Sequence, residues 1–221
     1  MIIAIDGPAG SGKSTTAKAV AARLGITYLD TGAMYRVITL KSLRTGVAAC
    51  DEPALAELTA NTIISFTGVL PDTKVWMDGE DVTDAIRGSE VTKYVSDYCA
   101  PSVVRDALVE QQRRIAQGNS VVCEGRDIGT VVFPDADLKF FMTASVEERA
   151  RRRQKDFEKL GVSKTVEELV KEISLRDHKD STRANSPLRK AQDAVEIDTT
   201  SLDLEMQVKF IIERALPLLK Q

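Results

Sequence analysis

The sequence is short of the residues on which several common kinds of active site depend. Its 221 residues include one histidine, His178, which argues against a histidine-rich metal site and against a Ser-His-Asp triad. Its three cysteines, Cys50, Cys99 and Cys123, are odd in number, widely spaced and form no C-x-x-C pair. Reduced thiols in a cytoplasmic protein are the simplest interpretation.

Long apolar runs and a strong excess of one charge are also absent. No apolar stretch approaches the roughly 20 residues of a membrane-spanning helix, and the run at 2–5 is too short for a signal-peptide core. The formal net charge of −3 indicates no general basic field for nucleic acid or a membrane surface. We therefore expect a cytoplasmic protein with a local ligand site. We also expect a monomer, because no unexplained apolar helix face stands out.

Strand and helix patterns alternate along most of the chain, which predicts a three-layer α/β/α fold with a central parallel sheet. Apolar runs predict buried strands at 2–5, 120–123 and 138–142, and two further strands are predicted at 26–29 and 194–197. Helical spacing predicts helices after residue 13, through 34–43, at 102–117 and at the C-terminal end, where Pro217 is expected to stop the helix. Ser145 with Glu148 and Thr165 with Glu168 predict two capping boxes.

A segment in the middle of the chain has a different pattern. Apolar and polar residues alternate at 64–66 and 75–77, as in half-buried strands. Asp78-Gly79 predicts a tight turn before a further short strand. We interpret residues 63–100 as a small β-containing insert within a single domain, 1–221.

The first motif with a chemical meaning is the glycine-rich turn after the first predicted strand. Residues 7–14 read Gly-Pro-Ala-Gly-Ser-Gly-Lys-Ser, which fits the P-loop pattern G-x-x-x-x-G-K-[ST]. The glycines let backbone N–H groups turn toward phosphates, and the following helix N-terminus adds partial positive charge. Lys13 can reach the β- and γ-phosphates, and the Ser14 hydroxyl can bind Mg²⁺. The motif predicts a nucleoside triphosphate site but does not identify the phosphate acceptor.

The turn after the second predicted strand is a candidate acceptor site. Residues 30–36 read Asp-Thr-Gly-Ala-Met-Tyr-Arg and follow the carboxyl end of that strand, where open parallel sheets bind ligands. A hydroxyl, a glycine and an arginine suit a phosphate-bearing acceptor. In the structural alternative, Thr31 caps the next helix and Arg36 is a solvated surface charge. The local sequence leaves both interpretations open.

A second polar turn, Glu-Gly-Arg-Asp-Ile-Gly at 124–129, follows the predicted strand at 120–123. Glu124 stands where P-loop proteins often keep an acid for the water shell of Mg²⁺. Arg126 could bind phosphate, and Asp127 could accept hydrogen bonds from a base or a hydroxyl. The structural alternative is an Asp127–Arg126 brace within the loop.

Arginines are concentrated in one predicted helix–loop–helix segment, residues 149–190. Arg149 and Arg153 share a helix face, as do Arg176 and Asp180 if that helix persists. A charge run is usually only a solvated face. Phosphoryl transfer, however, depends on cationic stabilisation and on closure against water, and an arginine-bearing flap would suit it.

These clusters together resemble those of the bacterial cytidylate kinases. The matching stretches are 7–14, 30–36, Gly-Arg-Asp-Ile-Gly-Thr-Val-Val-Phe-Pro at 125–134 and Arg-Asp-x-x-Asp-x-x-Arg at 176–183. The resemblance covers essentially the whole chain. It implies a kinase of pyrimidine nucleotide metabolism with a core, a nucleotide-binding insert and a lid. This enzyme would transfer the γ-phosphoryl group of ATP to CMP or dCMP with Mg²⁺.

The resemblance also implies roles for individual residues. ATP would be bound by Gly7, Pro8, Ala9, Gly10, Ser11, Gly12, Lys13, Ser14, Thr15 and Arg153, and Mg²⁺ by Ser14 and Glu124. The acceptor nucleotide would be bound by Thr31, Tyr35, Arg36, Ser96, Arg105, Arg126, Asp127, Asp180 and Arg183. Of these, Arg36, Arg126 and Arg183 would hold its phosphate, and Ser96, Arg105 and Asp127 would read the cytosine.

Arg176 and Asp180 would meet the ribose and the transferred group, and the catalytic residues would be Lys13, Arg126, Arg176 and Arg183. The family commonly has Asp at position 124. Glu124 keeps the charge on a longer side chain, so the resemblance implies an acid near Mg²⁺ but not the exact contact that Glu124 makes.

Three other functions compete with this one. A P-loop kinase for a non-nucleotide acceptor is disfavoured by the insert and by the Asp127 turn. A GTPase-like switch would need an Asn-Lys-x-Asp motif, which the sequence lacks. A catalytically silent nucleotide-binding scaffold is hard to reconcile with Lys13, Ser14 and the arginine segment. The preference among CMP, dCMP and UMP does not follow from the sequence.

Overall fold

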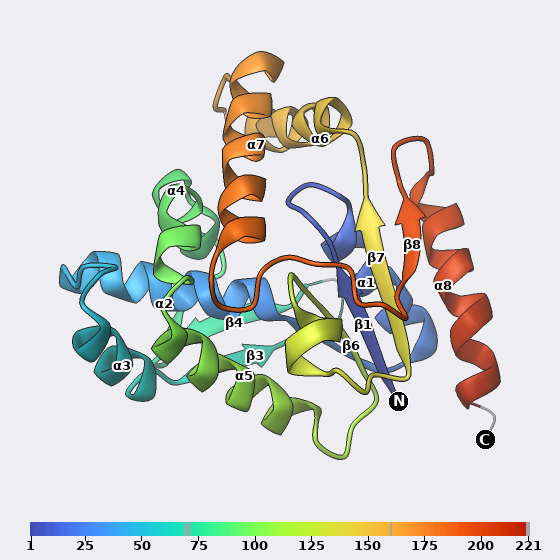
Figure 1. The fold of residues 1–221 in the computed structure, drawn as a ribbon, viewed down its shortest axis with the longest axis horizontal. Helices are drawn as coiled ribbons and strands as arrows, with labels where there is room; N and C mark the ends of the chain where they lie inside the picture. The colour runs from blue at the N-terminus through green and yellow to red at the C-terminus, as the bar shows by residue number, and fades with distance from the viewer. Residues whose placement is uncertain (69, 71, 160, 220–221) are drawn as a thin grey trace. The chain divides into compact units, whose positions relative to one another are not determined.

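The computed structural model describes residues 1–68, 70, 72–159 and 161–219 (Figure 1). The helices are α1 (Lys13–Leu24), α2 (Thr31–Thr45), α3 (Glu52–Ala60), α4 (Ser89–Tyr98), α5 (Ser102–Ala116), α6 (Val146–Lys159), α7 (Val166–Thr182) and α8 (Leu204–Leu219), with the short helices η1 (Ala85–Arg87) and η2 (Ile128–Val132). The strands are β1 (Ile2–Asp6), β2 (Thr27–Asp30), β3 (Ile64–Thr67), β4 (Lys74–Met77), β5 (Glu80–Asp81), β6 (Val121–Gly125), β7 (Leu138–Thr143) and β8 (Val195–Asp198). Within the described residues, no helix combines the length and the apolar character that a membrane crossing requires.

The larger sheet has five strands in the order β2-β6-β1-β7-β8. β1 pairs in parallel with β6 and β7, and β7 pairs in parallel with β8. Ile3, Ala4 and Ile5 are fully buried in β1, as expected for a parallel strand covered on both faces. This sheet and its helices confirm the predicted α/β fold. Because Asp6 pairs with Gly125, β1 and β6 end at the same edge of the sheet.

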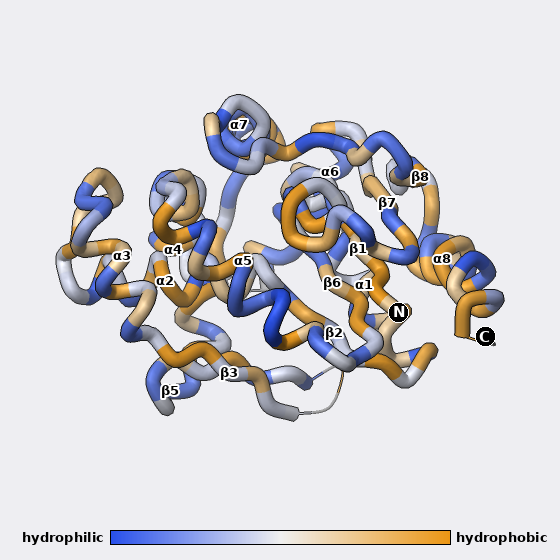
Figure 2. Tube along the Cα trace, turned by 60° about the horizontal axis from the view of Figure 1, so that its bottom comes forward, coloured by the Kyte–Doolittle hydropathy of each residue, from blue (hydrophilic) through white to orange (hydrophobic). Residues whose placement is uncertain are grey.

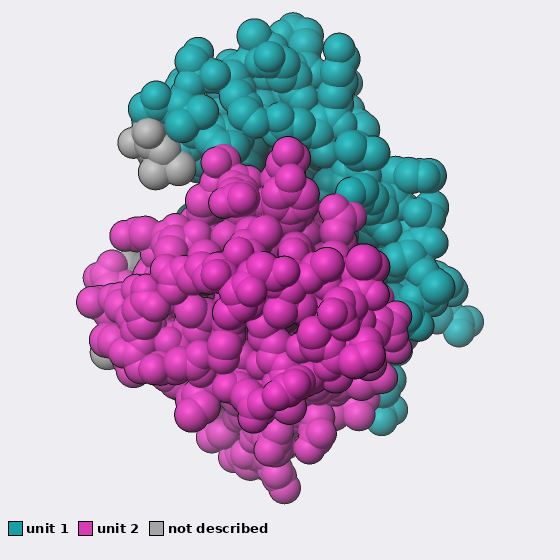
Figure 3. Space-filling model, turned by 90° about the vertical axis from the view of Figure 1, so that its left-hand side faces the viewer, with its two compact units in different colours: residues 1–28, 120–221 teal, residues 29–119 magenta. Residues whose placement is uncertain are grey.

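The chain divides into two compact units, which Figure 3 colours separately. Unit 1 comprises residues 1–28 and 120–221, and unit 2 comprises residues 29–119. Unit 1 contains the phosphate loop, the polar turn after β6 and the arginine-rich helices α6 and α7. Unit 2 contains residues 30–36 and the segment interpreted as an insert.

In unit 1, α8 packs against α1, and its buried residues include Val208, Ile211 and Ala215. Hydrophobic and hydrophilic stretches alternate along α8 in Figure 2. The prediction that Pro217 stops this helix is wrong, since α8 continues through Pro217 to Leu219. Proline holds φ near the helical value and removes a single N–H donor, so its effect this close to the helix end is confined to the last turn.

The two predicted capping boxes differ in the structure. At α7, Thr165 Oγ1 accepts from the Glu168 N–H (3.2 Å), and the Glu168 carboxylate accepts from the Thr165 N–H (2.8 Å), which confirms that box. At α6, Ser145 Oγ accepts from the Glu148 N–H, but the Ser145 N–H donates to Thr200 Oγ1. The second half of that box is therefore replaced by a contact from the β8–α8 turn.

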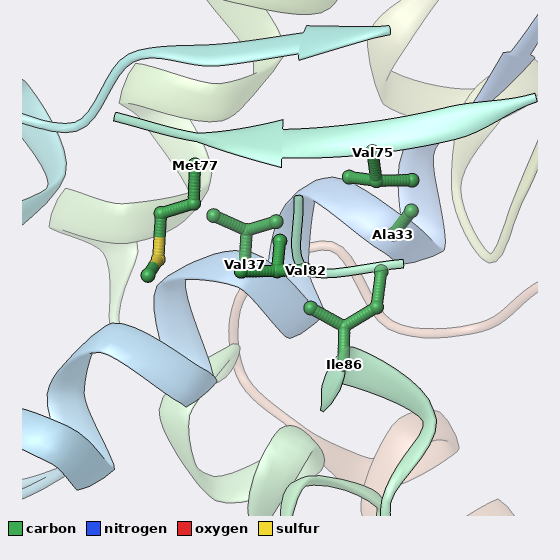
Figure 4. Close-up of a cluster of buried hydrophobic side chains, with 6 residues drawn as sticks. All are labelled: Ala33, Val37, Val75, Met77, Val82 and Ile86. Carbon is green, nitrogen blue, oxygen red and sulfur yellow. The ribbon is translucent and has the colours of Figure 1, made fainter. Parts of the chain in front are cut away.

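Unit 2 is built around α2 and a three-stranded antiparallel sheet, in the order β3-β4-β5. Buried apolar side chains of α2, the sheet and η1 form its core, drawn in Figure 4: Ala33, Val37, Val75, Met77, Val82 and Ile86. These strands confirm the period-two pattern at 64–66 and 75–77. The sequence reading missed α3 and α4. In α4, Val91, Val95 and Tyr98 have helical spacing, but β-branched and aromatic residues also favour strands and so hide that signal.

Candidate functional site

The phosphate loop lies in unit 1, between the end of β1 and the start of α1. Gly7 has φ +148°, and a Cβ at this position would lie 2.1 Å from the Met142 carbonyl oxygen. Only glycine therefore lets the loop pass this close to β7. The hydroxyl-bearing residues Ser14 and Thr15 are exposed in the first turn of α1.

Lys13 is turned inward against the loop. Its side chain is buried, and Nζ donates to the Pro8 carbonyl at 2.7 Å and lies 3.4 Å from Ser11 Oγ. Burial, followed by the nearby Arg126 charge, lowers the pKa of Lys13 to about 7, while Glu124 acts in the opposite direction. An anionic phosphate would supply the negative charge that favours the protonated amine.

Side chains from distant parts of unit 1 hold the outside of the loop. Arg149 donates through Nη1 to the Ala9 carbonyl (3.2 Å) and to Asp177 Oδ2 (2.6 Å), so it connects the loop to α7. Thr199 Oγ1 donates to the Ser11 carbonyl at 2.9 Å. Thr199 was not predicted, because a hydroxyl after β8 carries no signal that points to residue 11.

The polar turn after β6 provides the acidic side of the site. Glu124 is buried at the end of β6, and Tyr28 Oη donates to its Oε1 at 2.7 Å. Carboxylate and hydroxyl oxygens are hard donors of the kind that Mg²⁺ takes, so Glu124 and Ser14 fit this ion chemically. Among the described residues, no group of three or more His, Cys, Asp or Glu side chains could hold a metal ion by itself.

Ion pairs connect the same turn to α7. Arg126 Nε donates to Asp180 Oδ2 at 3.0 Å, and Arg176 Nε lies 3.8 Å from the same oxygen. Arg183 Nη2 lies 3.9 Å from Asp127 Oδ1. The predicted pairing of Arg176 with Asp180 on one helix face is confirmed. The turn is thus connected to α7 and to Arg183, which follows α7. The structural alternative, a brace between Asp127 and Arg126 within the turn, did not include these partners.

Burial and pairing act against each other on these charges. Burial alone would raise the pKa of Asp180, but the Arg126 and Arg176 charges outweigh it and hold that pKa below its usual range. Burial would likewise lower the pKa of Arg126, but the Asp180 carboxylate raises it above the ordinary value. Both groups are therefore charged at neutral pH.

Arg153, the arginine predicted to bind ATP, lies in the pair formed by α6 and α7. Its guanidinium carbon is 4.7 Å from the centroid of the Phe157 ring. Phe157 is part of the buried cluster between these helices, with Ala150, Leu169 and Ile173. Burial lowers the pKa of Arg153. Its role toward ATP stays a prediction.

In unit 2, the structure decides against the structural alternative for residues 30–36. The N-cap of α2 is Asp30, which accepts from the Ala33 N–H at 2.9 Å, and Thr31 is buried inside the helix. Arg36 is half-buried and donates to the Ile86 carbonyl (3.1 Å) and to Thr92 Oγ1 (2.9 Å). Thr31 is therefore not the cap, and Arg36 is not a solvated surface charge.

Two predicted acceptor residues meet in the core of unit 2. Arg105, at 2% exposure, lies with its guanidinium carbon 4.9 Å from the Tyr35 ring centroid and donates to the Cys99 carbonyl at 3.2 Å. Ser96 is half-buried on α4, the helix that also carries the Arg36 partner Thr92. A buried arginine against an aromatic face was not visible from spacing, since these residues are about 70 positions apart.

Comparison with known proteins identifies the family. Residues 3–220 match the family model described as cytidylate kinase. The chain belongs to the cytidylate kinase family. Within this family, the cytidylate kinase of Limosilactobacillus fermentum is 50% identical over 220 residues, which cover 99% of this chain and 97% of that protein.

Some of the matching relatives are much longer than this chain. A bifunctional pantoate ligase/cytidylate kinase of Trichormus variabilis is 52% identical over 216 residues, and the match covers 96% of this chain and 40% of the relative. This chain therefore spans about two fifths of that relative's length. The crystal structure of an uncharacterized protein from Eubacterium ventriosum has a TM-score of 0.50 and 14% identity, with 96% of both chains covered, and it supports the fold alone.

Proposed function

We propose that this chain transfers the γ-phosphoryl group of ATP to CMP or dCMP and releases ADP with CDP or dCDP. The observation that carries the proposal is the match of residues 3–220 to the cytidylate kinase family. The buried Lys13 of the phosphate loop and the ion pairs from the 125–129 turn to α7 support it, because they gather the cations that this chemistry uses. We place the reaction in the cytoplasm, in pyrimidine nucleotide metabolism.

In the proposed mechanism, an anionic oxygen of the acceptor phosphate attacks the γ-phosphorus in line with the leaving ADP oxygen. That oxygen is already charged, so no side chain has to act as nucleophile or strong base. Lys13, Arg176 and Arg183 stabilise the charge on the phosphoryl oxygens, and Arg126 holds the acceptor phosphate. Ser14 and Glu124 would hold Mg²⁺, which would supply positive charge next to the phosphates of the donor nucleotide.

In this proposal Asp127, Ser96 and Arg105 read the cytosine of the acceptor nucleotide. Asp180 meets the ribose, and the other proposed acceptor contacts are Thr31, Tyr35, Arg36, Arg126 and Arg183. We propose that residues 63–100, within unit 2, serve as the nucleotide-binding insert, and that residues 149–190, within unit 1, serve as the lid.

A coupled assay of ADP release tests the proposal. ATP and Mg²⁺ are supplied with CMP, dCMP, UMP, AMP, GMP or no acceptor. We expect the highest turnover with CMP and dCMP and almost none without acceptor. Equal ADP release in every reaction would identify an NTPase, and the acceptor roles of Arg36, Arg126, Asp127 and Arg183 would then be withdrawn.

A further inference from the structure

Asp6 is a buried carboxylate that neither the motifs nor the proposed mechanism uses. It is the last residue of β1, is 4% exposed and directly precedes Gly7 of the phosphate loop. Its Oδ1 accepts from the Ile128 N–H at 2.8 Å, and its Oδ2 accepts from the Gly129 N–H at 2.7 Å. One side chain therefore connects the start of the phosphate loop to the turn that carries Arg126 and Asp127.

The two N–H groups that Asp6 binds belong to the first residues of η2, which begins immediately after Asp127. The first N–H groups of a helix have no acceptor within the helix, so an acceptor from elsewhere fixes where the helix starts. The start of η2 in turn fixes the backbone of Asp127, its N-cap residue. The Asp6 carboxylate thereby fixes the backbone that carries the Asp127 and Arg126 side chains.

The surroundings of the carboxylate are closely packed. A Cβ on Gly129 would lie at contact distance from Asp6 Oδ2, 3.4 Å, and 3.2 Å from Lys139 Cδ. Asp6 itself is held on both sides, since it pairs with Gly125 of β6 and Phe141 of β7. The carboxylate is thus a fixed point to which the turn is attached.

The carboxylate form is required by the geometry. Asn has the shape of Asp but only one acceptor atom, so it can satisfy one of the two N–H groups and presents an N–H₂ group to the other. The arrangement also has a cost, because burial raises the pKa of Asp6 to about 6, with a smaller contribution from the Asp127 charge. A neutral side chain would avoid that cost but would release the turn.

We propose that Asp6 is a positioning residue for the acceptor nucleotide, which acts by fixing the backbone on which Arg126 and Asp127 stand. The proposal rests on the function proposed above, in which those two side chains bind the phosphate and the base of CMP. Asp6 itself touches neither substrate in this role. Its loss is expected to weaken acceptor binding and base discrimination more than ATP binding.

The test compares Asp6→Asn with Asp137→Asn. Asp137 Oδ2 accepts from the Ile2 N–H at 2.6 Å, so it makes the same kind of bond to the other end of the same strand, at an exposed position. Calorimetry measures the Kd of CMP alone, and steady-state kinetics gives KM for CMP and for ATP. For Asp6→Asn we expect the Kd and KM of CMP to rise about 10- to 100-fold, because misplacing a binding group by about 1 Å has effects of this size.

The same variant is expected to change KM for ATP by less than about three-fold and to lower the preference for CMP over UMP roughly ten-fold, a split that general destabilisation does not produce. Asp137→Asn should leave all these quantities within about three-fold of the unmodified protein. Unchanged CMP binding in Asp6→Asn, or an equal rise of both KM values, would overturn the proposal.

Asp6→Glu keeps the proposal testable if Asp6→Asn does not fold. Glutamate keeps both acceptor oxygens but carries them one methylene group further from the backbone, so it displaces the start of η2, and we expect the same selective loss of CMP binding. Normal CMP binding by Asp6→Glu would then overturn the proposal. Failure of the unmodified protein to phosphorylate CMP would refute the proposed function, whereas normal activity with equal behaviour of Asp6→Asn and Asp137→Asn refutes only the role of Asp6.

Discussion

The phosphate loop and the 125–129 turn follow neighbouring strands of one sheet, yet they are built in different ways. The loop presents its backbone, and its path depends on Gly7, where a Cβ would lie 2.1 Å from a carbonyl of β7. The turn presents the side chains of Arg126 and Asp127, which are oriented by ion pairs with Asp180 and Arg183. The path of the loop therefore depends mainly on glycine and on the neighbouring strand, with outer contacts from Arg149 and Thr199. The turn, by contrast, depends on ion pairs with a distant helix.

This difference shows what each part tolerates. A loop shaped by glycines and by a strand edge can keep its path when a functional side chain such as Lys13 is removed. A turn held by buried ion pairs loses both stability and function when one partner is removed, because the other charge stays buried. Variants of the loop that lose stability, or variants of the turn that keep it, would contradict this difference between the two regions.

The largest effect is expected for Lys13→Ala. Turnover should fall about 10³-fold or more, because the variant removes the cation that we propose reaches the transferred phosphates. The free energy of unfolding should not fall, since burial lowers the pKa of this amine to about 7 and its charged form is poorly solvated. The ADP-release assay and urea unfolding measure the two quantities. Lys18→Ala, on the same helix, is the control, and full turnover of Lys13→Ala would show that the loop has another role.

Asp180→Asn tests the turn. Asp180 is 4% exposed and accepts from Arg126, whose side chain is 19% exposed, so neutralising Asp180 leaves this partly buried guanidinium beside a neutral amide. We expect the free energy of unfolding to fall by about 3 to 4 kcal/mol, as for other broken buried ion pairs. Urea unfolding at pH 7 measures this change.

The control for Asp180→Asn is Asp193→Asn. Asp193 is the exposed partner of Lys139, and its loss should cost less than about 1 kcal/mol. An equally small effect of Asp180→Asn would mean that the turn does not depend on its pairing with α7. The two regions would then be held in the same way.

The titration of Asp6 is expected to make the free energy of unfolding depend on pH. Its folded-state pKa is about 6 against a reference value of 3.8, so the folded protein binds more protons than the unfolded chain between these values. The contribution of Asp6 to stability is therefore present below pH 3.8 and is lost as the pH rises through 6. Since one pKa unit corresponds to about 1.4 kcal/mol, the loss amounts to about 3 kcal/mol.

Urea unfolding of the unmodified protein and of Asp6→Asn between pH 4 and 7.5 measures that loss. The stability of the unmodified protein should decline relative to the variant as the pH rises, because the amide does not titrate. Two curves that stay parallel over this range would show that the Asp6 carboxylate is not destabilised by its burial.

The same difference between regions explains how much the sequence could predict. The strands, the parallel sheet and the phosphate loop follow from apolar runs and from one contiguous motif, and the structure confirms them. The period-two strands of unit 2 were also predictable, but α4 was not, since Val91 and Val95 suit a strand as well as a helix.

The 125–129 turn was only partly predictable from the sequence. Its residues were found because they are polar and follow a buried strand. Their partners could not be found in this way, because Asp180 is 54 positions from Arg126 and Asp6 is 122 positions from Ile128. Asp6 did carry one signal, as an acid at the end of a fully apolar strand. Nothing in its spacing, however, indicated which N–H groups it would accept from.

The smallest expected effect concerns Arg149, which contacts both the loop and α7. Arg149 donates through one nitrogen to the Ala9 carbonyl and to Asp177, and through Nε to the Ala144 carbonyl at 3.0 Å. Lysine keeps the charge but cannot reproduce this fork of donors. Arg149→Lys should therefore raise KM for ATP about ten-fold and leave KM for CMP nearly unchanged, the reverse of the split expected for Asp6→Asn.

Steady-state kinetics of Arg149→Lys beside Arg151→Lys measures this effect, since Arg151 lies on the same helix with an exposed side chain. Arg151→Lys should match the unmodified protein in both KM values. An unchanged KM for ATP in Arg149→Lys would show that the loop keeps its shape without the contact that Arg149 makes to Ala9. An equal rise of both KM values would instead indicate a general disturbance of unit 1, because the same side chain also binds Asp177 of α7.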